Sequence, residues 1–146
     1  MRTNNENGFS LIELLLVVVI IGVLAALAVP ALRKAQRTTE NGATIATLRT
    51  IGSSQVSYYT QNRRFGRLPE INTVEVTPFG TTVADRVVKG EFVYEMPSAP
   101  TDEELQTEFT ILATRNMSGE EVVAYELNQT GRIRQVLPFI REDLGN

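Results

Sequence analysis

The stretch that decides the fold is Gly8-Phe9-Ser10-Leu11-Ile12-Glu13, followed at residues 14–32 by the uncharged run LLLVVVIIGVLAALAVPAL. A membrane-spanning helix needs about 20 apolar residues, and this run is close to that length. Glu13 stands at its edge, where a carboxylate is costly, by about 3 kcal/mol if it were carried to the bilayer centre. We therefore expect Glu13 to have a partner.

Cleavage of the bond between Gly8 and Phe9 would supply that partner. It would leave a free amine on Phe9, four residues before Glu13. An α-amino group is mostly protonated at neutral pH, so the amine and the acid could pair between neighbouring subunits. The pair would lose water during assembly, and its attraction offsets that cost only with good geometry. The alternatives are an acid that reaches out to water and a turn glycine before a helix capped by Ser10.

Three interpretations of the apolar run are open from the residues alone. It could be a plain membrane anchor, or a secretory signal cut after the small-x-small site Ala26-Leu27-Ala28, or a retained segment behind a short leader. A secretory signal is disfavoured because the leader has one basic residue, Arg2, and because Glu13 stands where the apolar core of a signal would begin.

The order of residues from Gly8 to Val18 resembles the N-terminal signature of type IV prepilins and pseudopilins. The glycine, the aromatic residue, the acid and the apolar run all stand at the spacing of that family, and the resemblance extends to Leu32. It implies that a prepilin peptidase removes residues 1–8 and methylates Phe9. It also implies that Glu13 sets the register of each subunit in a helical filament.

The resemblance further implies a structural protein without an enzymatic activity. Such a subunit is inserted in the inner membrane and is then polymerised by an assembly platform into a homo-oligomeric type IV pilus at the cell surface. The alternative is a pseudopilin of a type II secretion system, in a periplasmic pseudopilus. The sequence does not distinguish these two, nor a major from a minor subunit. Many type IV pilins close a C-terminal loop with a disulfide, and this chain differs because it has no cysteine.

A membrane-anchored enzyme or binding domain is a less favoured hypothesis. The 146 residues suit one domain, and they include no histidine and no cysteine, which removes the commonest general base and the commonest nucleophilic thiol. The sequence also has no Gly-rich phosphate loop and no paired catalytic carboxylates. We expect no catalytic residue, no metal and no cofactor.

Residues 9–59 predict one long helix, about 75 Å from end to end. Its first half, residues 9–32, is apolar on all sides, as in a helix enclosed by lipid or by other helices. Gly22 and Pro30 interrupt this half, and a proline inside a helix favours a kink or local melting. In assembled filaments of the family, the stretch between a matching glycine and proline can lose its helical structure.

The remaining residues, 33–146, predict a globular head. Apolar residues at helical spacing form a stripe of Ile45, Leu48, Gly52, Val56 and Tyr59, as in a helix that packs on a sheet. The fold class is α+β and type IV pilin-like, with the long N-terminal helix on a small antiparallel β-meander. Four strands are predicted, at residues 91–96, 108–114, 122–127 and 132–137. The connections are a loop at 61–80 with a short strand at 74–76, a loop or helical turn at 101–106, and turns at 116–119 and 128–131.

Three clusters of charge have competing interpretations. Arg33, Lys34 and Arg37 follow the apolar run and could attract anionic head groups on one side of a bilayer. They lie on the translocated side if the leader is cytoplasmic, opposite to the usual distribution of positive charge, so we favour filament contacts or a solvated surface. Arg63, Arg64 and Arg67 surround Phe65 and could bind single-stranded nucleic acid. The net charge of −3 makes that unlikely, so we favour a solvated loop or a subunit contact. Residues 102–104 are three acids that could bind calcium, but a solvated acidic turn is favoured because no calcium-loop spacing is present.

Overall fold

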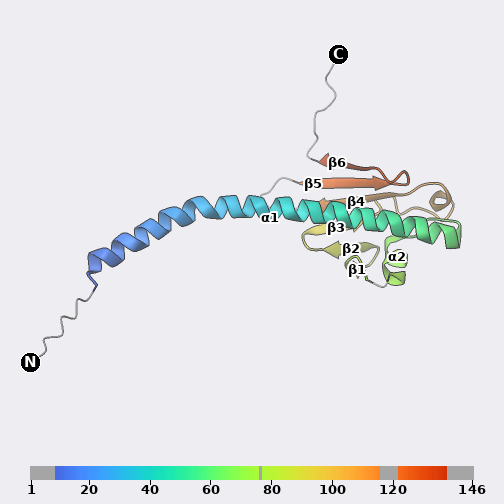
Figure 1. Ribbon diagram of the computed structural model, residues 1–146. Coiled ribbons are helices and arrows are strands. Elements are labelled where there is room, and N and C mark those ends of the chain that lie inside the picture. The colour runs from blue at the N-terminus through green and yellow to red at the C-terminus, as the bar shows by residue number, and fades with distance from the viewer. Residues whose placement is uncertain (1–8, 76, 116–121, 138–146) are drawn as a thin grey trace, which may run out of the picture. The chain divides into compact units, whose positions relative to one another are not determined.

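A computed structural model describes residues 9–75, 77–115 and 122–137 of the chain. The chain divides into two compact units, residues 1–39 and residues 40–146. The first unit contains the beginning of one long helix. The second contains the rest of that helix, a short helix and a β-sheet (Figure 1).

The helix α1 spans Leu11–Asn62 and confirms the prediction of one long N-terminal helix. It is helical through Gly22 and Pro30. By length and composition it is the one helix in the described parts of the chain that could cross a membrane. The helix ends where Arg63 adopts the left-handed backbone conformation, with φ of 58°.

The sheet of the second unit has six strands in the described residues, and each pairs antiparallel with its neighbour in sequence, in the order β1 to β6 (Figure 1). This confirms the predicted meander and extends it. The strands are β1 (Thr81–Val83), β2 (Arg86–Lys89), β3 (Phe92–Glu95), β4 (Thr110–Arg115), β5 (Val123–Asn128) and β6 (Ile133–Leu137).

Two connections in the sheet match the predictions. The predicted turn at 128–131 joins β5 to β6, and Gly131 supplies the positive φ of 74° that this turn requires. The predicted helical turn at 101–106 is the 3₁₀ helix η1 (Glu104–Gln106). The predicted turn at 116–119 lies outside the described residues.

The segment predicted as a loop with a short strand is where the prediction was wrong. Residues Leu68–Val74 form the helix α2, and Val74 is its last residue rather than the start of a strand. Pro69 and Glu70 stand in the first turn, and the Glu70 carboxylate accepts the Arg67 backbone N–H at 2.7 Å. A proline and an acid at these positions favour a helix start, so the sequence did contain the signal.

Strands β1 and β2 were also not predicted. All three residues of β1 are exposed, and in β2 only Val87 is buried. Neither strand therefore shows the alternation of apolar and polar residues that marks a half-buried strand.

The buried face of α1 in the second unit matches the predicted stripe only in part. Leu48 is buried as expected, but Val56 is 61% exposed and Ile51 is buried instead. Four polar residues share the buried face, and they are Thr44, Thr47, Ser54 and Gln55. A stripe drawn through apolar residues alone therefore missed the polar residues that share the buried face.

Hydrogen bonds explain why polar side chains are tolerated on that face. The Gln55 side chain donates to the Gly66 carbonyl at 2.7 Å and accepts the Gly66 backbone N–H at 2.8 Å. Lys89 on β2 donates to the Thr47 hydroxyl at 3.0 Å, and that hydroxyl donates to the Ala43 carbonyl of its own helix at 3.0 Å. Because a buried polar group is costly only when it lacks a partner, these residues join the helix to the sheet and to the following loop at little cost.

The core lies between α1, α2 and the sheet. Gly52 permits a close approach to the sheet, since a Cβ atom there would lie 3.6 Å from the Leu127 side chain of β5. Four of the buried residues of the core are the aromatics Phe92, Tyr94, Phe109 and Tyr125. The other buried apolar residues are Leu48, Ile51, Leu68, Ile71, Phe79, Val87, Leu105, Ile111, Ala113, Val123, Ala124 and Leu127.

Two glycine substitutions should change the stability of this unit in opposite directions. A Cβ atom at Gly66 would lie 2.5 Å from the Ile71 side chain and 3.1 Å from the Tyr58 ring, so Gly66→Ala should destabilise by about 1–3 kcal/mol. Gly42 lies exposed inside α1 with open space around it, so Gly42→Ala should stabilise by about 0.5–1 kcal/mol. Urea unfolding of the full chain in detergent, followed by circular dichroism, measures both. Equal effects of the two variants would contradict the packing described for Gly66.

Candidate functional site

The first candidate site is the start of α1. The Glu13 carboxylate Oε2 accepts the Ser10 backbone N–H at 3.1 Å, and the Ser10 carbonyl accepts the backbone N–H of Glu13 at 3.0 Å and that of Leu14 at 3.2 Å. Glu13 therefore caps the first turn of its own helix, which satisfies a backbone donor that the helix leaves free. The sequence analysis had placed a cap only on Ser10 and had given Glu13 no contact within its own chain.

The other residues predicted for this site lie next to that cap. Phe9 is 88% exposed and immediately precedes Ser10. Gly8 lies outside the described residues. The described part of the site thus presents one carboxylate and one aromatic residue at the exposed end of a helix.

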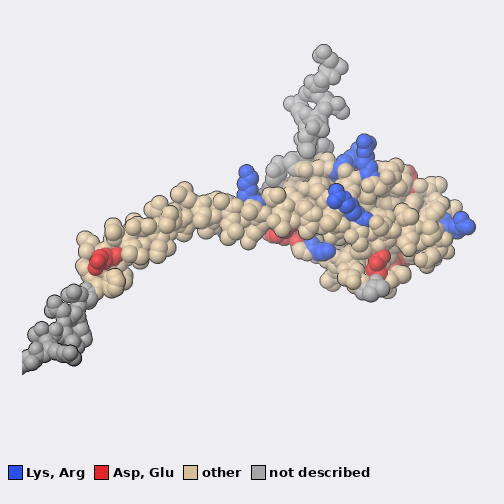
Figure 2. Space-filling view, in the orientation of Figure 1, with Lys and Arg blue, Asp and Glu red and all other residues tan. Residues whose placement is uncertain are grey.

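An uncovered apolar surface follows this end of the helix. The large apolar residues from Leu11 to Leu32 are between 48% and 81% exposed. Figure 2 shows the helix of the first unit as uncharged surface from the acidic patch near its start to a basic side chain farther along. Gly22 has no neighbouring atom within 4 Å of a potential Cβ. A helix that is apolar all round requires lipid or other helices against it.

The second candidate site is the arginine cluster that follows α1. The Arg64 guanidinium makes two parallel hydrogen bonds to the Glu70 carboxylate, at 2.8 and 2.9 Å, and lies 5.5 Å from the centre of the Tyr58 ring. Arg67 pairs with Asp102 at 2.7 Å and donates to the Pro100 carbonyl. These contacts join the loop after α1 to α2 and to the segment that leads into η1.

The same contacts set the protonation of the cluster. The hydrogen bond from Arg64 is the main cause that lowers the pKa of Glu70 to about 2, and burial partly opposes it. The bond to Glu70 likewise raises the pKa of Arg64, which stays charged. Because acids already engage two of the three arginines, the cluster favours the structural interpretation over nucleic-acid binding.

The acidic segment 102–104 is similarly engaged within the fold. Asp102 pairs with Arg67, and the Glu104 carboxylate accepts the Thr101 backbone N–H at 2.8 Å. Across the part of the chain that the structure describes, no group of three acidic residues is arranged to hold a metal ion. The segment therefore fits a structural turn better than a calcium site.

Sequence analysis missed a buried ion-pair cluster at Arg115. This side chain at the end of β4 is 5% exposed and lies 3.4 Å from the Glu40 carboxylate and 3.8 Å from that of Glu91. Its guanidinium also lies 5.4 Å from the centre of the Phe92 ring. The cluster joins the beginning of the second unit's helical part to β3 and β4. Only the paired strands bring these residues together, so no local sequence signal marks them.

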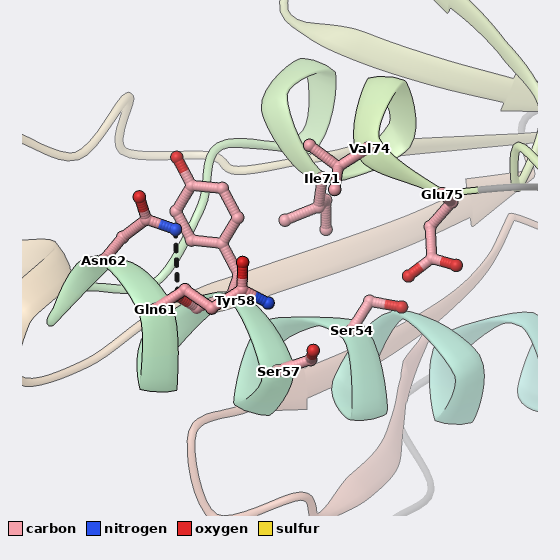
Figure 3. A pocket seen from close by; sticks show the side chains of 8 residues that line it. All are labelled: Ser54, Ser57, Tyr58, Gln61, Asn62, Ile71, Val74 and Glu75. Carbon is pink, nitrogen blue, oxygen red and sulfur yellow. Dashed lines mark hydrogen bonds between the residues drawn. The ribbon is translucent and has the colours of Figure 1, made fainter.

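A hollow of about 300 Å³ lies between α1 and α2 (Figure 3). Its lining is mostly polar and consists of Ser54, Ser57, Tyr58, Gln61, Asn62, Ile71, Val74 and Glu75. The Ser54 hydroxyl donates to the Thr50 carbonyl of its own helix, and the Asn62 side chain donates to the Tyr58 carbonyl. Since Ser54 is bonded to its own backbone and Glu75 is the one acid present, the hollow assembles no activated nucleophile. The hollow therefore gives no support to the hypothesis of a membrane-anchored enzyme.

Comparison with known proteins points to the first site. Residues 3–29 match the family model described as the prokaryotic N-terminal methylation motif. The chain is 38% identical over 65 residues to the type IV major pilin protein PilA of Myxococcus xanthus (strain DK1622). That alignment covers 44% of this chain and 30% of the relative. No solved structure matches the chain.

The Arg64–Glu70 pair should make stability depend on acidic pH. Because the pKa of Glu70 is lowered from 4.5 to about 2, its contribution is complete above pH 4.5 and is lost as the pH falls toward 2. Glu70→Gln should therefore unfold more easily than the unmodified chain at pH 7. After allowance for solvent screening at this partly exposed site, we expect a difference of about 1–2 kcal/mol that shrinks as the pH falls toward 2.

Urea unfolding of the full chain at a series of pH values measures this difference. Glu75→Gln is the matched control, because it removes the same charge from a carboxylate without an ion pair among the described residues. A constant gap between Glu70→Gln and the unmodified chain from pH 7 to pH 2 would rule out the pair as the cause.

Proposed function

We propose that this chain, which the methylation motif and the pilin relative support as a type IV pilin-family protein, is a structural subunit of a type IV pilus. The observation that carries the proposal is the exposed apolar helix behind Glu13. In the membrane, lipid covers this surface, and in a filament, the same surface packs against other copies of the chain. The hydrophobic effect then stabilises the filament once subunits leave the bilayer.

Processing is the first step of the proposal. A prepilin peptidase cleaves between Gly8 and Phe9, removes the leader 1–8 and methylates the Phe9 amine. The motif match over residues 3–29 supports this step, because the match includes both residues of the cleavage site. The mature chain then begins with the positive charge that Glu13 requires.

Assembly is the second step. The Phe9 amine of one subunit pairs with Glu13 of a neighbour and sets the axial register of the filament. The exposed position of both residues at the end of α1 supports the pairing. The cap that Glu13 makes with Ser10 supports it further, since the bond to the Ser10 N–H engages one carboxylate oxygen and holds the acid at the helix end.

Assembly also involves partners and a change in the helix. An assembly platform in the inner membrane extracts the subunits, and the pilus extends from the cell surface. The interval between Gly22 and Pro30 loses its helical structure in the filament, because Pro30 already removes one hydrogen bond there. The subunit itself carries out no catalytic step.

A pilus is favoured over a secretion pseudopilus because the relative is a type IV major pilin. Both assemblies use the same N-terminal segment, so the methylation motif does not separate them. Deletion of the gene in its host distinguishes them, since loss of surface filaments supports the pilus and loss of protein secretion supports the pseudopilus.

The mass of the mature chain tests the processing step. Intact-mass measurement and N-terminal peptide sequencing of the protein from its host should give a chain that begins at methylated Phe9. A chain that begins at Val29 would identify a secretory signal, and an intact Met1 terminus would identify a plain membrane anchor. Either result would reject the proposal.

Two substitutions at Glu13 separate its charge from its cap. A glutamine at this position can still accept the Ser10 N–H, whereas an alanine cannot. If pairing with the Phe9 amine requires the charge, Glu13→Gln and Glu13→Ala should both reduce filament yield at least tenfold, which corresponds to about 1.4 kcal/mol per subunit contact. Membrane insertion and folding of the head should be unchanged in both.

The measurement is the amount of sheared filament from cells in which the variant is the sole subunit, with carbonate extraction of membranes as the control for insertion. Normal yield from Glu13→Gln together with loss in Glu13→Ala would show that the cap, and not the ion pair, is what assembly needs.

A further inference from the structure

The apolar part of the first unit is bounded by charges at two defined positions. Glu13 precedes residue 14 and Arg33 follows residue 32, with no charged residue between them. Twenty helical steps of 1.5 Å separate the two, which is about 30 Å along the axis. The hydrocarbon core of a bilayer is also about 30 Å thick. When Glu13 lies at one edge of that core, Arg33 lies at the other.

Three basic residues gather at this second edge, and we name Arg33, Lys34 and Arg37 the basic collar. All three are exposed, and α1 continues as regular helix through them. At 100° per residue their side chains fall within about a third of the helix circumference. The hydroxyls of Thr38 and Thr39 donate to the carbonyls of Lys34 and Ala35, so these polar groups beside the collar are already paired within the helix.

Two charges of the collar, those of Arg33 and Lys34, are not neutralised by acids among the described residues. Within the described part of the chain, the side chains of Arg33 and Lys34 have no hydrogen-bond or ion-pair partner. The one acid among residues 9–39 is Glu13, about 30 Å away, beyond the screening length of about 8 Å at physiological salt. The next acid along the chain, Glu40, pairs with Arg115.

The position of the collar is opposite to the usual distribution of charge. If the leader stays inside, the collar must cross the membrane to the outer side, where basic residues are disfavoured. A cluster retained there needs a contact that offsets this cost. Lipid phosphates supply one, because the long stems of arginine and lysine lie along the hydrocarbon while their heads reach the phosphate layer.

We propose that the basic collar binds the phosphates of anionic lipids at the outer edge of the inner membrane and so fixes the depth of the stored subunit. The inference rests on the proposed function for the orientation of the chain in the membrane. Arginine donates two hydrogen bonds to one phosphate, and lysine acts as a point charge on the next. A subunit that enters a filament must release these lipids.

The test measures lipid selection around the inserted helix. The full chain is reconstituted into phosphatidylcholine vesicles that contain a quarter phosphatidylglycerol. Spin-labelled versions of each lipid report the immobilised fraction by electron paramagnetic resonance. The unmodified chain should select phosphatidylglycerol over phosphatidylcholine, and Arg33→Gln with Lys34→Gln should reduce that selection by about fivefold or more at low salt. Salt at 0.5 M, a concentration that screens surface charge, should reduce the selection in the unmodified chain as well.

Arg49→Gln with Arg132→Gln is the matched control, because it removes two exposed positive charges from the second unit and leaves the collar intact. This control should retain the selection for phosphatidylglycerol. Equal selection by the collar variant and the unmodified chain would overturn the inference. Equal selection together with loss of filaments in the collar variant would also overturn it and assign the collar to subunit contacts.

The lipid-selection experiment can fail or succeed independently of the proposed function. Lipid selection is measured on inserted chains without filaments, whereas pilus assembly is judged by the mature N-terminus and by sheared filaments. A chain that selects anionic lipid through the collar but keeps Met1 would support the collar and reject the pilus subunit.

Discussion

A helix covered all round with leucine, valine and isoleucine cannot remain in water, and this constraint dominates the first unit. Each such side chain gains about 1.5–3 kcal/mol when it leaves water completely. In the first unit these residues are at least 48% exposed, so the gain is still available to a partner. Lipid and other copies of the helix are equally apolar, so moving between them changes little hydrophobic energy. Polar contacts at the two ends of the run can therefore decide which environment the helix occupies.

The second unit meets a different requirement, because it must be stable in water without help from the first. It buries a complete apolar core and holds its connections with paired polar groups. The Gln55 side chain takes the place of a backbone hydrogen-bond partner for Gly66. Glu70 holds the loop after α1 through its bonds to Arg64. Arg115 joins the helix to the sheet through its pair with Glu40. These contacts hold the loop after α1 and join the helix to the sheet, so paired polar groups stabilise the second unit together with its apolar core.

Much of this architecture is predictable because it depends on local patterns. The long helix follows from the apolar run, and β3 to β6 follow from alternating residues and a glycine turn. The buried face of α1 does not follow, because Gln55 is buried through a bond to Gly66, which lies 11 residues away. Strands β1 and β2 were not predicted, because pairing with neighbouring strands holds them in the sheet and their own residues show no strand pattern.

In the candidate site, too, local sequence patterns predict some features, and contacts between distant residues determine the others. The spacing of Glu13 behind Phe9 predicts that these two residues act in processing and assembly, and the motif match over residues 3–29 includes both positions. The bond between Glu13 and Ser10 was not foreseen, although an acid three residues into a helix is a recognised cap. The role of Arg115 could not be foreseen, because its acids come from residues 40 and 91.

The order of the strands has a consequence for folding kinetics. Every strand from β1 to β6 pairs with the strand next to it in sequence, so no pairing waits for a distant segment of the chain. Local pairings of this kind favour fast folding, since little loop-closure entropy is lost before each contact forms. The chain also has no cysteine, so folding does not depend on the slow step of disulfide formation. A sheet built in this way can form early in folding, even where no oxidising machinery is present.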